Sequence, residues 1–149
     1  MQAEFKTNSL TETHTVAKDL ANQFKNQGGI VLLSGNLGAG KTAFTQGFIK
    51  SFGITRNITS PTFLLVKQYQ IPNSDNWIFH LDLYRLAEPI DLITTGIQEI
   101  LETAAQNIIL IEWSEKIKSQ LSNYNYVEVK IEKGQDDDTR IISIERHHL

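Results

Sequence analysis

The stretch that decides the fold of this chain is Gly35-Asn36-Leu37-Gly38-Ala39-Gly40-Lys41-Thr42. It has the spacing G-x-x-x-x-G-K-[ST] of a Walker A motif, or P-loop. Glycines in such a loop let successive backbone N–H groups approach a phosphate, and the helix that follows adds its positive dipole end. The Lys41 ammonium is expected to reach the β- and γ-phosphates, and the Thr42 hydroxyl to ligate Mg²⁺. The motif therefore predicts a site for a triphosphate nucleotide with Mg²⁺.

The segments on either side of the loop agree with this prediction. Residues 30–33 form a short, fully apolar run, which is typical of a strand buried on both faces. Residues 41–52 carry apolar side chains at helical spacing, and Gly53 follows where a helix-ending glycine belongs. A P-loop requires this order of strand, loop and helix.

The rest of the chain predicts two more helices and further strands. Ser9 and Glu12 have capping-box spacing and introduce a helix over residues 10–25, and a third helix is expected over residues 88–101, with Gly96 a possible interruption. The predicted strands cover residues 63–69, 77–81, 107–111, 126–132 and 140–145. The first two of these strands and the last two are separated by turn-rich segments, so each pair predicts an antiparallel hairpin. We therefore predict an α/β fold: a single P-loop NTPase-like domain over residues 1–149, with a mixed central sheet flanked by helices and a C-terminal β-hairpin. The order of the strands does not follow from the sequence.

Composition narrows the class of protein. A chain of 149 residues has the size of one domain, and its net charge of −3 argues against a protein that coats DNA or RNA. There is no cysteine, which excludes disulfides and thiolate metal sites. The polar start lacks the apolar run of a signal peptide, and no apolar stretch approaches the about 20 residues of a membrane helix. We expect a cytoplasmic protein that does not bind membranes.

Two acidic residues follow predicted strands and are candidates for the second anchor of Mg²⁺. Glu112 comes directly after the apolar strand 107–111, and Asp82 follows the strand 77–81. One would hold the metal and the other would orient the attacking water or sense the γ-phosphate, but the sequence does not allocate these roles. The segment 59–62 is either a switch-like loop that reaches the γ-phosphate or a polar turn shaped by Pro61.

Together these residues resemble a known family. The P-loop, Ser60-Pro61-Thr62-Phe63, His80-Leu81-Asp82-Leu83-Tyr84-Arg85 and Glu112-Trp113 occur in the order seen in the TsaE family. These are small bacterial ATPases required for the threonylcarbamoyladenosine (t6A) modification of tRNA. The resemblance covers nearly the whole chain, and the combination of motifs is far more specific than the P-loop alone.

The resemblance implies an activity and partners. Members bind ATP or ADP with Mg²⁺, hydrolyse ATP weakly, and work with a complex of TsaB and TsaD, of which TsaD is the transferase. Contact with tRNA is then indirect, through that complex, and no role on DNA is implied.

The resemblance also assigns roles to residues of this sequence. It implies that Lys41 is the phosphate lysine, that Thr42 and Glu112 are Mg²⁺ ligands, and that Asp82 is needed for hydrolysis. Lys41, Asp82 and Glu112 are thus the candidate catalytic residues. The candidate nucleotide-binding residues are Thr11, Thr13, Gly35, Asn36, Leu37, Gly38, Ala39, Gly40, Lys41, Thr42, Ala43 and Trp113. Many members have Asp where this chain has Asn36, which removes one negative charge near the phosphates.

Other functions of a P-loop stay open. A small-molecule kinase is the main alternative, but it needs an arginine-bearing lid, and only Arg56, Arg85, Arg140 and Arg146 are present. A GTP-dependent switch would carry an Asn-Lys-x-Asp segment, which does not occur in the sequence. A module that binds nucleotide without hydrolysing it is a further alternative, and only the presence of Asp82 and Glu112 argues against it.

Overall fold

The computed structural model describes residues 2–36, 38–59 and 65–148, and its strands form one seven-stranded sheet. The strand order is β1-β7-β6-β2-β5-β4-β3. The four central strands run parallel to one another: β6 (Tyr126–Lys133), β2 (Gly29–Ser34), β5 (Ile108–Glu112) and β4 (Trp77–Asp82). The outer strands are antiparallel: β1 (Gln2–Thr7) and β7 (Arg140–His147) on one side, and β3 (Val66–Gln70) on the other. The predicted α/β class with a mixed sheet is confirmed.

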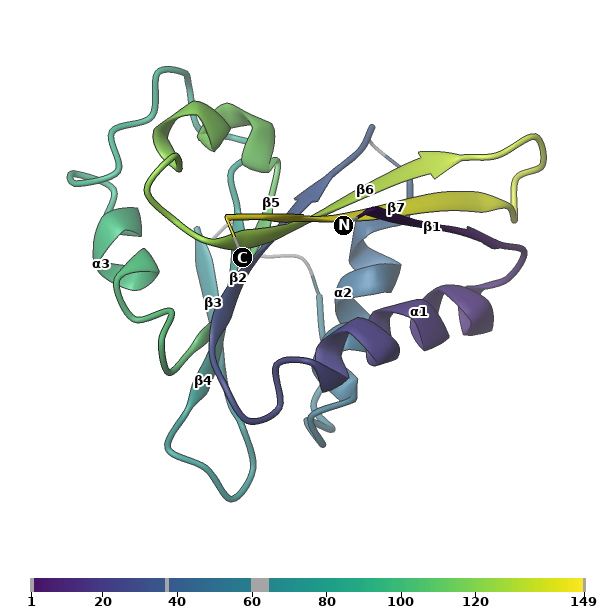
Figure 1. Ribbon diagram of the computed structural model, residues 1–149, viewed down its shortest axis with the longest axis horizontal. Helices are drawn as coiled ribbons and strands as arrows, with labels where there is room; N and C mark the ends of the chain where they lie inside the picture. Colours follow the sequence, from purple (N-terminus) through teal and green to yellow (C-terminus); the bar gives the residue numbers. More distant parts are fainter. Residues whose placement is uncertain (1, 37, 60–64, 149) are drawn as a thin grey trace.

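Helices cover the two faces of this sheet in two layers (Figure 1). On one face, α1 (Leu10–Asn22) and α2 (Lys41–Lys50) pack on β2, β6 and β7. On the other, α3 (Ile97–Leu101) and the 3₁₀ turns η1 (Ser114–Lys116) and η2 (Lys118–Gln120) lie near β5 and β4. Successive side chains of a strand point to opposite faces, so Val31 and Leu33 join the first core and Leu32 joins the second.

The first two helices begin where the sequence predicts them and end earlier. Ser9 caps α1, since its Oγ accepts a hydrogen bond from the Glu12 N–H at 3.1 Å. The helices were predicted to extend to residues 25 and 52, whereas residues 23–25 and 51–52 form turns. The two helices pack closely: a Cβ on Gly47 would lie 2.8 Å from the Cα of His14.

The prediction of one helix over residues 88–101 is wrong for most of its length. Only α3 is helical, and residues 88–96 form bends and turns. The Asp91 carboxylate accepts hydrogen bonds from the N–H groups of Ile93 and Thr94, at 2.9 and 3.3 Å, which stabilises a turn instead. Gly96 then starts α3 with a φ of +79°, outside the helical region.

Both predicted hairpins are confirmed as antiparallel pairs. In the first hairpin, the strand predicted over residues 63–69 is observed at Val66–Gln70. Residues 63 and 64 lie outside the described part of the chain. Strand β1 was not predicted, although Ala3, Phe5 and Thr7 alternate there with polar residues. In the described part of the chain, no helix is long and apolar enough to cross a membrane.

Candidate functional site

The candidate site lies at the edge of the sheet where the parallel strands β2, β4 and β5 end. Leu33 of β2 is in register with Glu112 of β5, and Glu112 is in register with Asp82 of β4. The P-loop leaves β2 two residues after Leu33. Ligands of open α/β sheets bind at this carboxyl edge. The fold therefore brings the P-loop and both acidic residues to one edge.

The glycines of the P-loop have conformations that other residues avoid. Gly35 has a φ of +147°, and a Cβ there would lie 2.4 Å from the carbonyl oxygen of Ile131. Gly40 is the N-cap of α2, with a φ of +109°. These glycines let the loop turn tightly against β6 and enter α2, whose first N–H groups have no partners within the helix. Leu37 lies outside the described residues.

The Lys41 side chain is folded inward over the loop. Its Nζ donates to the Gly35 carbonyl at 2.5 Å and lies 3.8 Å from the centroid of the Trp113 ring. Lys41 is only 6% exposed. Burial lowers the pKa of Lys41 below its ordinary value, and the negative charges of Glu112, Glu115 and Asp82 act in the opposite direction. The three carboxylates thus favour the charged form of the Lys41 ammonium, which is the form that can bind a phosphate.

The Glu112 carboxylate is buried and held by a histidine. Glu112 is 3% exposed, and its Oε2 lies 2.7 Å from the Nε2 of the fully buried His80. His80 lies on β4, two residues before Asp82, so the side chains of His80 and Asp82 share one face of the sheet. A buried carboxylate needs such partners because its desolvation is costly. The contact fixes where the Glu112 side chain points.

Asp82 lies at the end of β4 and is more accessible than Glu112. Its Oδ1 accepts a hydrogen bond from the Tyr84 N–H at 3.0 Å. This turn places Tyr84 beside Trp113, with ring centroids 5.0 Å apart. Asp82 is thus a half-buried carboxylate in register with the buried carboxylate of Glu112.

Trp113 adopts a strained backbone conformation directly after Glu112. Its φ of +58° lies in the left-handed region, which is rare for a bulky residue. The following residues hold this turn: Ser114 Oγ donates to the Leu33 carbonyl at 3.2 Å, and Lys116 Nζ donates to the carbonyls of Tyr84 and Leu86. The Trp113 ring is thereby held between Lys41 and Tyr84. Such strain is common at functional sites.

Comparison with known proteins identifies the family. The family described as "Threonylcarbamoyl adenosine biosynthesis protein TsaE" matches residues 7–142, which include every element from α1 to the first residues of β7. The chain belongs to the TsaE family.

The similarity of this TsaE-family chain to named relatives extends over nearly its whole length. It is 43% identical to the tRNA threonylcarbamoyladenosine biosynthesis protein TsaE of Rickettsia typhi, covering 95% of this chain and 94% of that protein. The protein of the same name from Bacillus subtilis is 34% identical, over 94% and 84% of the two chains. The crystal structure of Bacillus subtilis YdiB has a TM-score of 0.74 and 32% identity, covering 97% of this chain and 84% of that one.

The donor set of this TsaE-family site suits Mg²⁺. Thr42 offers an exposed hydroxyl in the first turn of α2, and Glu112 and Asp82 offer carboxylates. Mg²⁺ takes hard oxygen ligands and usually binds through one or two carboxylates together with phosphates. Among the described residues, no three His, Cys, Asp or Glu side chains form a metal cage by themselves. The residues therefore fit a metal that is shared with a nucleotide.

The two threonines of α1 differ in their surroundings. Thr11 is exposed, whereas Thr13 is buried, with its Oγ1 2.9 Å from the Oγ1 of Thr7. The Thr13 hydroxyl is thus already engaged inside the protein, and Thr11 is the more accessible of the two for a ligand. Both assignments to the nucleotide stay predictions.

Arg140, at the start of β7, lies against the P-loop, and the sequence reasoning gave it no role at the site. A Cβ on Gly40 would lie 3.4 Å from its Nε. The neighbouring Thr139 hydroxyl lies 3.4 Å from Asn8 Oδ1, just before α1. The C-terminal hairpin and the start of α1 therefore adjoin the loop. Only the antiparallel pairing of β7 with β6 brings Arg140 there, and nothing in the local sequence signals it.

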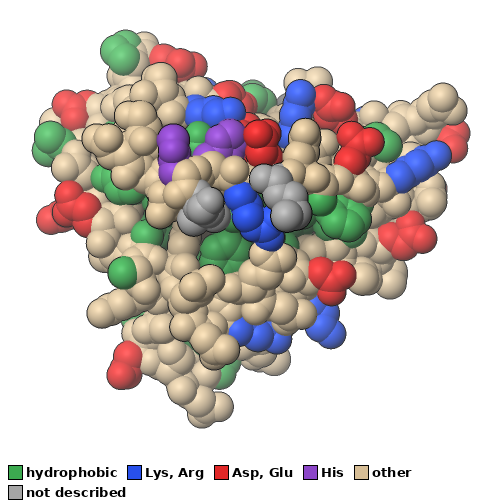
Figure 2. Space-filling view, viewed as in Figure 1, with side chains coloured by type: hydrophobic (Ala, Val, Ile, Leu, Met, Phe, Trp, Pro, Cys, Tyr) green, Lys and Arg blue, Asp and Glu red, His purple; other side chains and the backbone are tan. Residues whose placement is uncertain are grey.

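The segment 59–62 is described only at Thr59, whose Oγ1 accepts a hydrogen bond from Lys67. Residues 60–62 lie outside the described part, so the choice between a switch and a turn stays open. Arg56 donates to the Gln68 carbonyl at 2.9 Å and lies 4.3 Å from the Tyr69 ring centroid. The side chains of Lys67 and Arg56 thus both have partners within the protein. In the face shown in Figure 2, basic and acidic side chains are interspersed.

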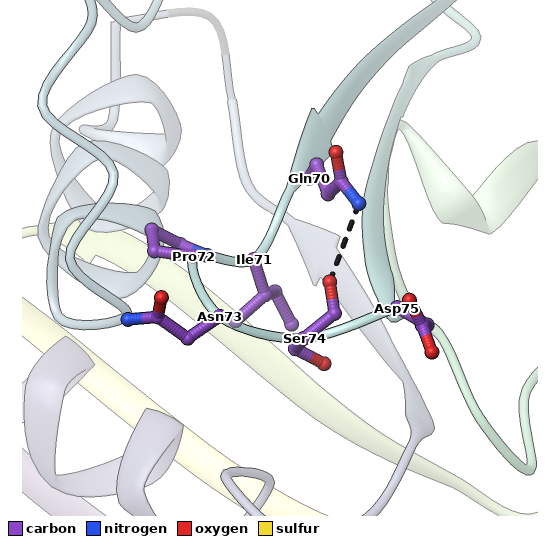
Figure 3. A pocket seen from close by; sticks show the side chains of 6 residues that line it. All are labelled: Gln70, Ile71, Pro72, Asn73, Ser74 and Asp75. Atoms are coloured by element: carbon purple, nitrogen blue, oxygen red, sulfur yellow. Dashed lines mark hydrogen bonds between the residues drawn. The ribbon is translucent and has the colours of Figure 1, made fainter.

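A separate hollow lies at the opposite end of the sheet, in the turn between β3 and β4 (Figure 3). It has a volume of about 470 Å³ and is lined by residues 70–75. Gln70 Nε2 donates to the Ser74 carbonyl at 3.3 Å across it. All six lining residues belong to this one turn, so the hollow is a feature of the turn and not part of the P-loop site.

Proposed function

We propose that this chain binds ATP or ADP with Mg²⁺ at its P-loop, hydrolyses ATP slowly, and serves tRNA threonylcarbamoyladenosine biosynthesis together with TsaB and TsaD. The observation that carries the proposal is the meeting of Lys41 with the in-register pair Asp82 and Glu112 at one edge of the sheet. Relatives that match nearly the whole chain bear the name of that pathway. We further propose that residues 1–149 act as one domain in the cytoplasm.

Lys41 would bind and neutralise the phosphates. Its ammonium carries three donors and uses one on the Gly35 carbonyl, so two others are available for phosphate oxygens. The N–H groups at the start of α2 would add further donors of fixed direction. Electrostatic stabilisation of this kind supplies most of the catalysis in phosphoryl transfer.

Glu112 and Thr42 would hold Mg²⁺, which when bound neutralises charge on the β- and γ-phosphates. Burial and the His80 contact keep Glu112 in one orientation, which favours it as the metal ligand. Asp82 is more accessible and is held by a backbone N–H instead. We assign to Asp82 the orientation of the attacking water and acceptance of its proton.

TsaB and TsaD are the proposed partners, and tRNA would be reached through them. The charge supports indirect contact, because a net charge of −3 leaves no general basic footprint for RNA. Slow turnover suits a protein whose nucleotide state controls a complex more than its product does.

The test of this proposal is ATP turnover by the pure chain, alone and with the TsaB–TsaD pair. We expect slow turnover alone, and either a faster rate or a nucleotide-dependent complex when the pair is added. The Lys41→Ala variant is the control and should lose both. If neither rate nor binding responds to the pair, the role in the pathway is wrong, and transfer from ATP to small acceptors would then be measured to test a kinase.

A further inference from the structure

Strand β1 forms an edge of the sheet whose outer side is open. Its main chain pairs with β7 through six residue pairs on one side. In the described part of the chain, no hydrogen bond other than those to β7 engages the main chain of residues 2–7. Phe5 of this strand is 41% exposed, although it lies opposite the fully buried Ile142. An open edge with an exposed aromatic side chain is a template for pairing with another strand.

The other edge of the sheet is protected. Arg56 donates to the main-chain carbonyl of Gln68 on β3 at 2.9 Å, and its guanidinium lies over the Tyr69 ring. A charged side chain that occupies an edge carbonyl is one of the ways in which proteins block strand addition. The two edges therefore differ, and only β1 is available along its length among the described strands.

The sequence of β1 is complementary to itself in one antiparallel register. When two copies pair about a two-fold axis perpendicular to the sheet, each residue of one β1 strand lies opposite a residue of the other. The side chains of two opposite residues lie on the same face of the sheet, so the two residue numbers are both odd or both even. With the axis at Phe5, Glu4 lies opposite Lys6 of the second copy, and Lys6 lies opposite its Glu4. Moving the axis to residue 4 or 6 places Glu4 against Glu4, or Lys6 against Lys6. Like charges directly opposite destabilise a sheet, whereas opposite charges stabilise it.

We propose that β1 is the docking surface for a second copy of this chain, paired antiparallel about Phe5. The two Phe5 side chains then face each other on the helix-covered side of the sheet and lose their exposure. Two ion pairs between Glu4 and Lys6 form on the opposite, open side. Across β7, the partners of Glu4 and Lys6 are Ser143 and Ile141, so neither charge is engaged by a residue directly opposite it. The result is one continuous sheet through both copies, with both P-loops outside the interface.

A pairing of six residues per strand is small, so the dimer is expected to be weak and reversible. Sedimentation equilibrium of the full chain should show dissociation in the range of about 0.1 to 1 mM, typical of small interfaces. Amide exchange of residues 2–7 should slow as concentration rises, whereas that of β3 should not change. A chain that stays monomeric to about 1 mM would overturn the proposal.

Charge exchange tests the register. Glu4→Lys and Lys6→Glu each turn two attractive pairs into two repulsive ones, and each should weaken the dimer about tenfold or more. The double variant Glu4→Lys with Lys6→Glu recreates the pairs in reverse and should restore the wild-type constant. Glu99→Lys and Lys25→Glu make the same charge changes at exposed sites elsewhere and should have no effect. Equal weakening by these controls, or no recovery in the double variant, would show that β1 does not pair as proposed.

Discussion

At the scale of single residues, the site depends on how Glu112 is held. Its carboxylate comes from the most buried strand of the sheet, and the contact with His80 compensates part of its desolvation. His80 Nδ1 is itself buried without a hydrogen-bond partner in the described part of the chain. A buried nitrogen without a hydrogen-bond partner lowers the stability of the fold, so its presence needs an explanation. We infer that His80 is kept for its contact with Glu112.

The His80→Ala variant should therefore be less stable. Loss of a hydrogen bond to a buried charged group costs about 1 to 3 kcal/mol, and the small side chain adds a cavity. Urea unfolding measures this free energy. The His80→Ala change made in a Glu112→Gln background serves as the matched control, because its cost should fall when the carboxylate is gone. Equal costs in both backgrounds would mean that the contact contributes nothing.

Thr42→Ala and Asp82→Ala should separate binding from hydrolysis. Thr42→Ala removes a proposed Mg²⁺ ligand and should weaken Mg²⁺-dependent ATP binding about tenfold, equivalent to about 1.4 kcal/mol. Asp82→Ala should leave that binding nearly unchanged while hydrolysis stops. Titration calorimetry with and without Mg²⁺, beside a turnover assay, measures both. Loss of binding in Asp82→Ala would instead make Asp82 a metal ligand, and unchanged affinity in Thr42→Ala would undercut the metal assignment.

At the scale of elements, the loop between β2 and α2 depends on the space around its glycines. Gly35→Ala would place a Cβ 2.4 Å from the Ile131 carbonyl, whereas a Cβ on Gly38 meets nothing within 4 Å. Gly38 has a φ of +79°, so Gly38→Ala should cost about 1 to 2 kcal/mol for the backbone conformation alone. Gly35→Ala should cost about 1 to 3 kcal/mol more because of the clash. Thermal unfolding compares them, and equal losses would contradict the close packing of the loop on β6.

The turn after β5 gives the site an optical probe. The Trp113 ring lies 3.8 Å from Lys41 Nζ, so drawing Lys41 towards a phosphate should change the fluorescence of Trp113. The other tryptophan, Trp77, begins β4 at the opposite end of the sheet. Addition of Mg²⁺-ATP should therefore change the emission of wild type and of Trp77→Phe, but not of Trp113→Phe. A response that survives in Trp113→Phe and disappears in Trp77→Phe would place the nucleotide elsewhere.

The elements that the sequence predicted well are those with a strong local signal. The apolar runs of β2 and β5 and the capping box of α1 determine those elements by themselves. The helix over residues 88–101 failed because the Asp91 turn and Gly96 outweighed a helical pattern. Strand β1 was missed because an exposed edge strand has little apolar signal, and its alternation is clear only beside β7.

The same distinction applies to the candidate site. Lys41 could be found from the P-loop motif, and Asp82 and Glu112 from their places directly after predicted strands. The structure brings all three to one edge of the sheet. The contact of His80 with Glu112 depends on two strands that are separated by about thirty residues, and Arg140 depends on the pairing of β7. These contacts follow from strand order, which the sequence left open.

At the scale of the whole molecule, the candidate nucleotide site and the proposed pairing surface lie on different parts of the sheet. The carboxyl edge holds the P-loop and the acidic pair, and the opposite end holds ordinary turns. Strands β7 and β6 separate the β1 edge from β2. A strand can therefore pair with β1 without contacting β4 or β5. Nucleotide binding and the proposed pairing of two copies are therefore expected to be independent, and the Glu4→Lys variant should keep the ATP affinity of wild type.

We propose that the carboxyl edge of the sheet holds one nucleotide with Mg²⁺. Titration calorimetry with ATP, with and without Mg²⁺, on wild type and Lys41→Ala tests it most directly. We predict one nucleotide per chain, tighter binding with Mg²⁺, and a loss of at least about tenfold in affinity in Lys41→Ala. Equal affinity of both proteins for ATP, or an affinity that does not depend on Mg²⁺, would show that the nucleotide is not bound at this edge.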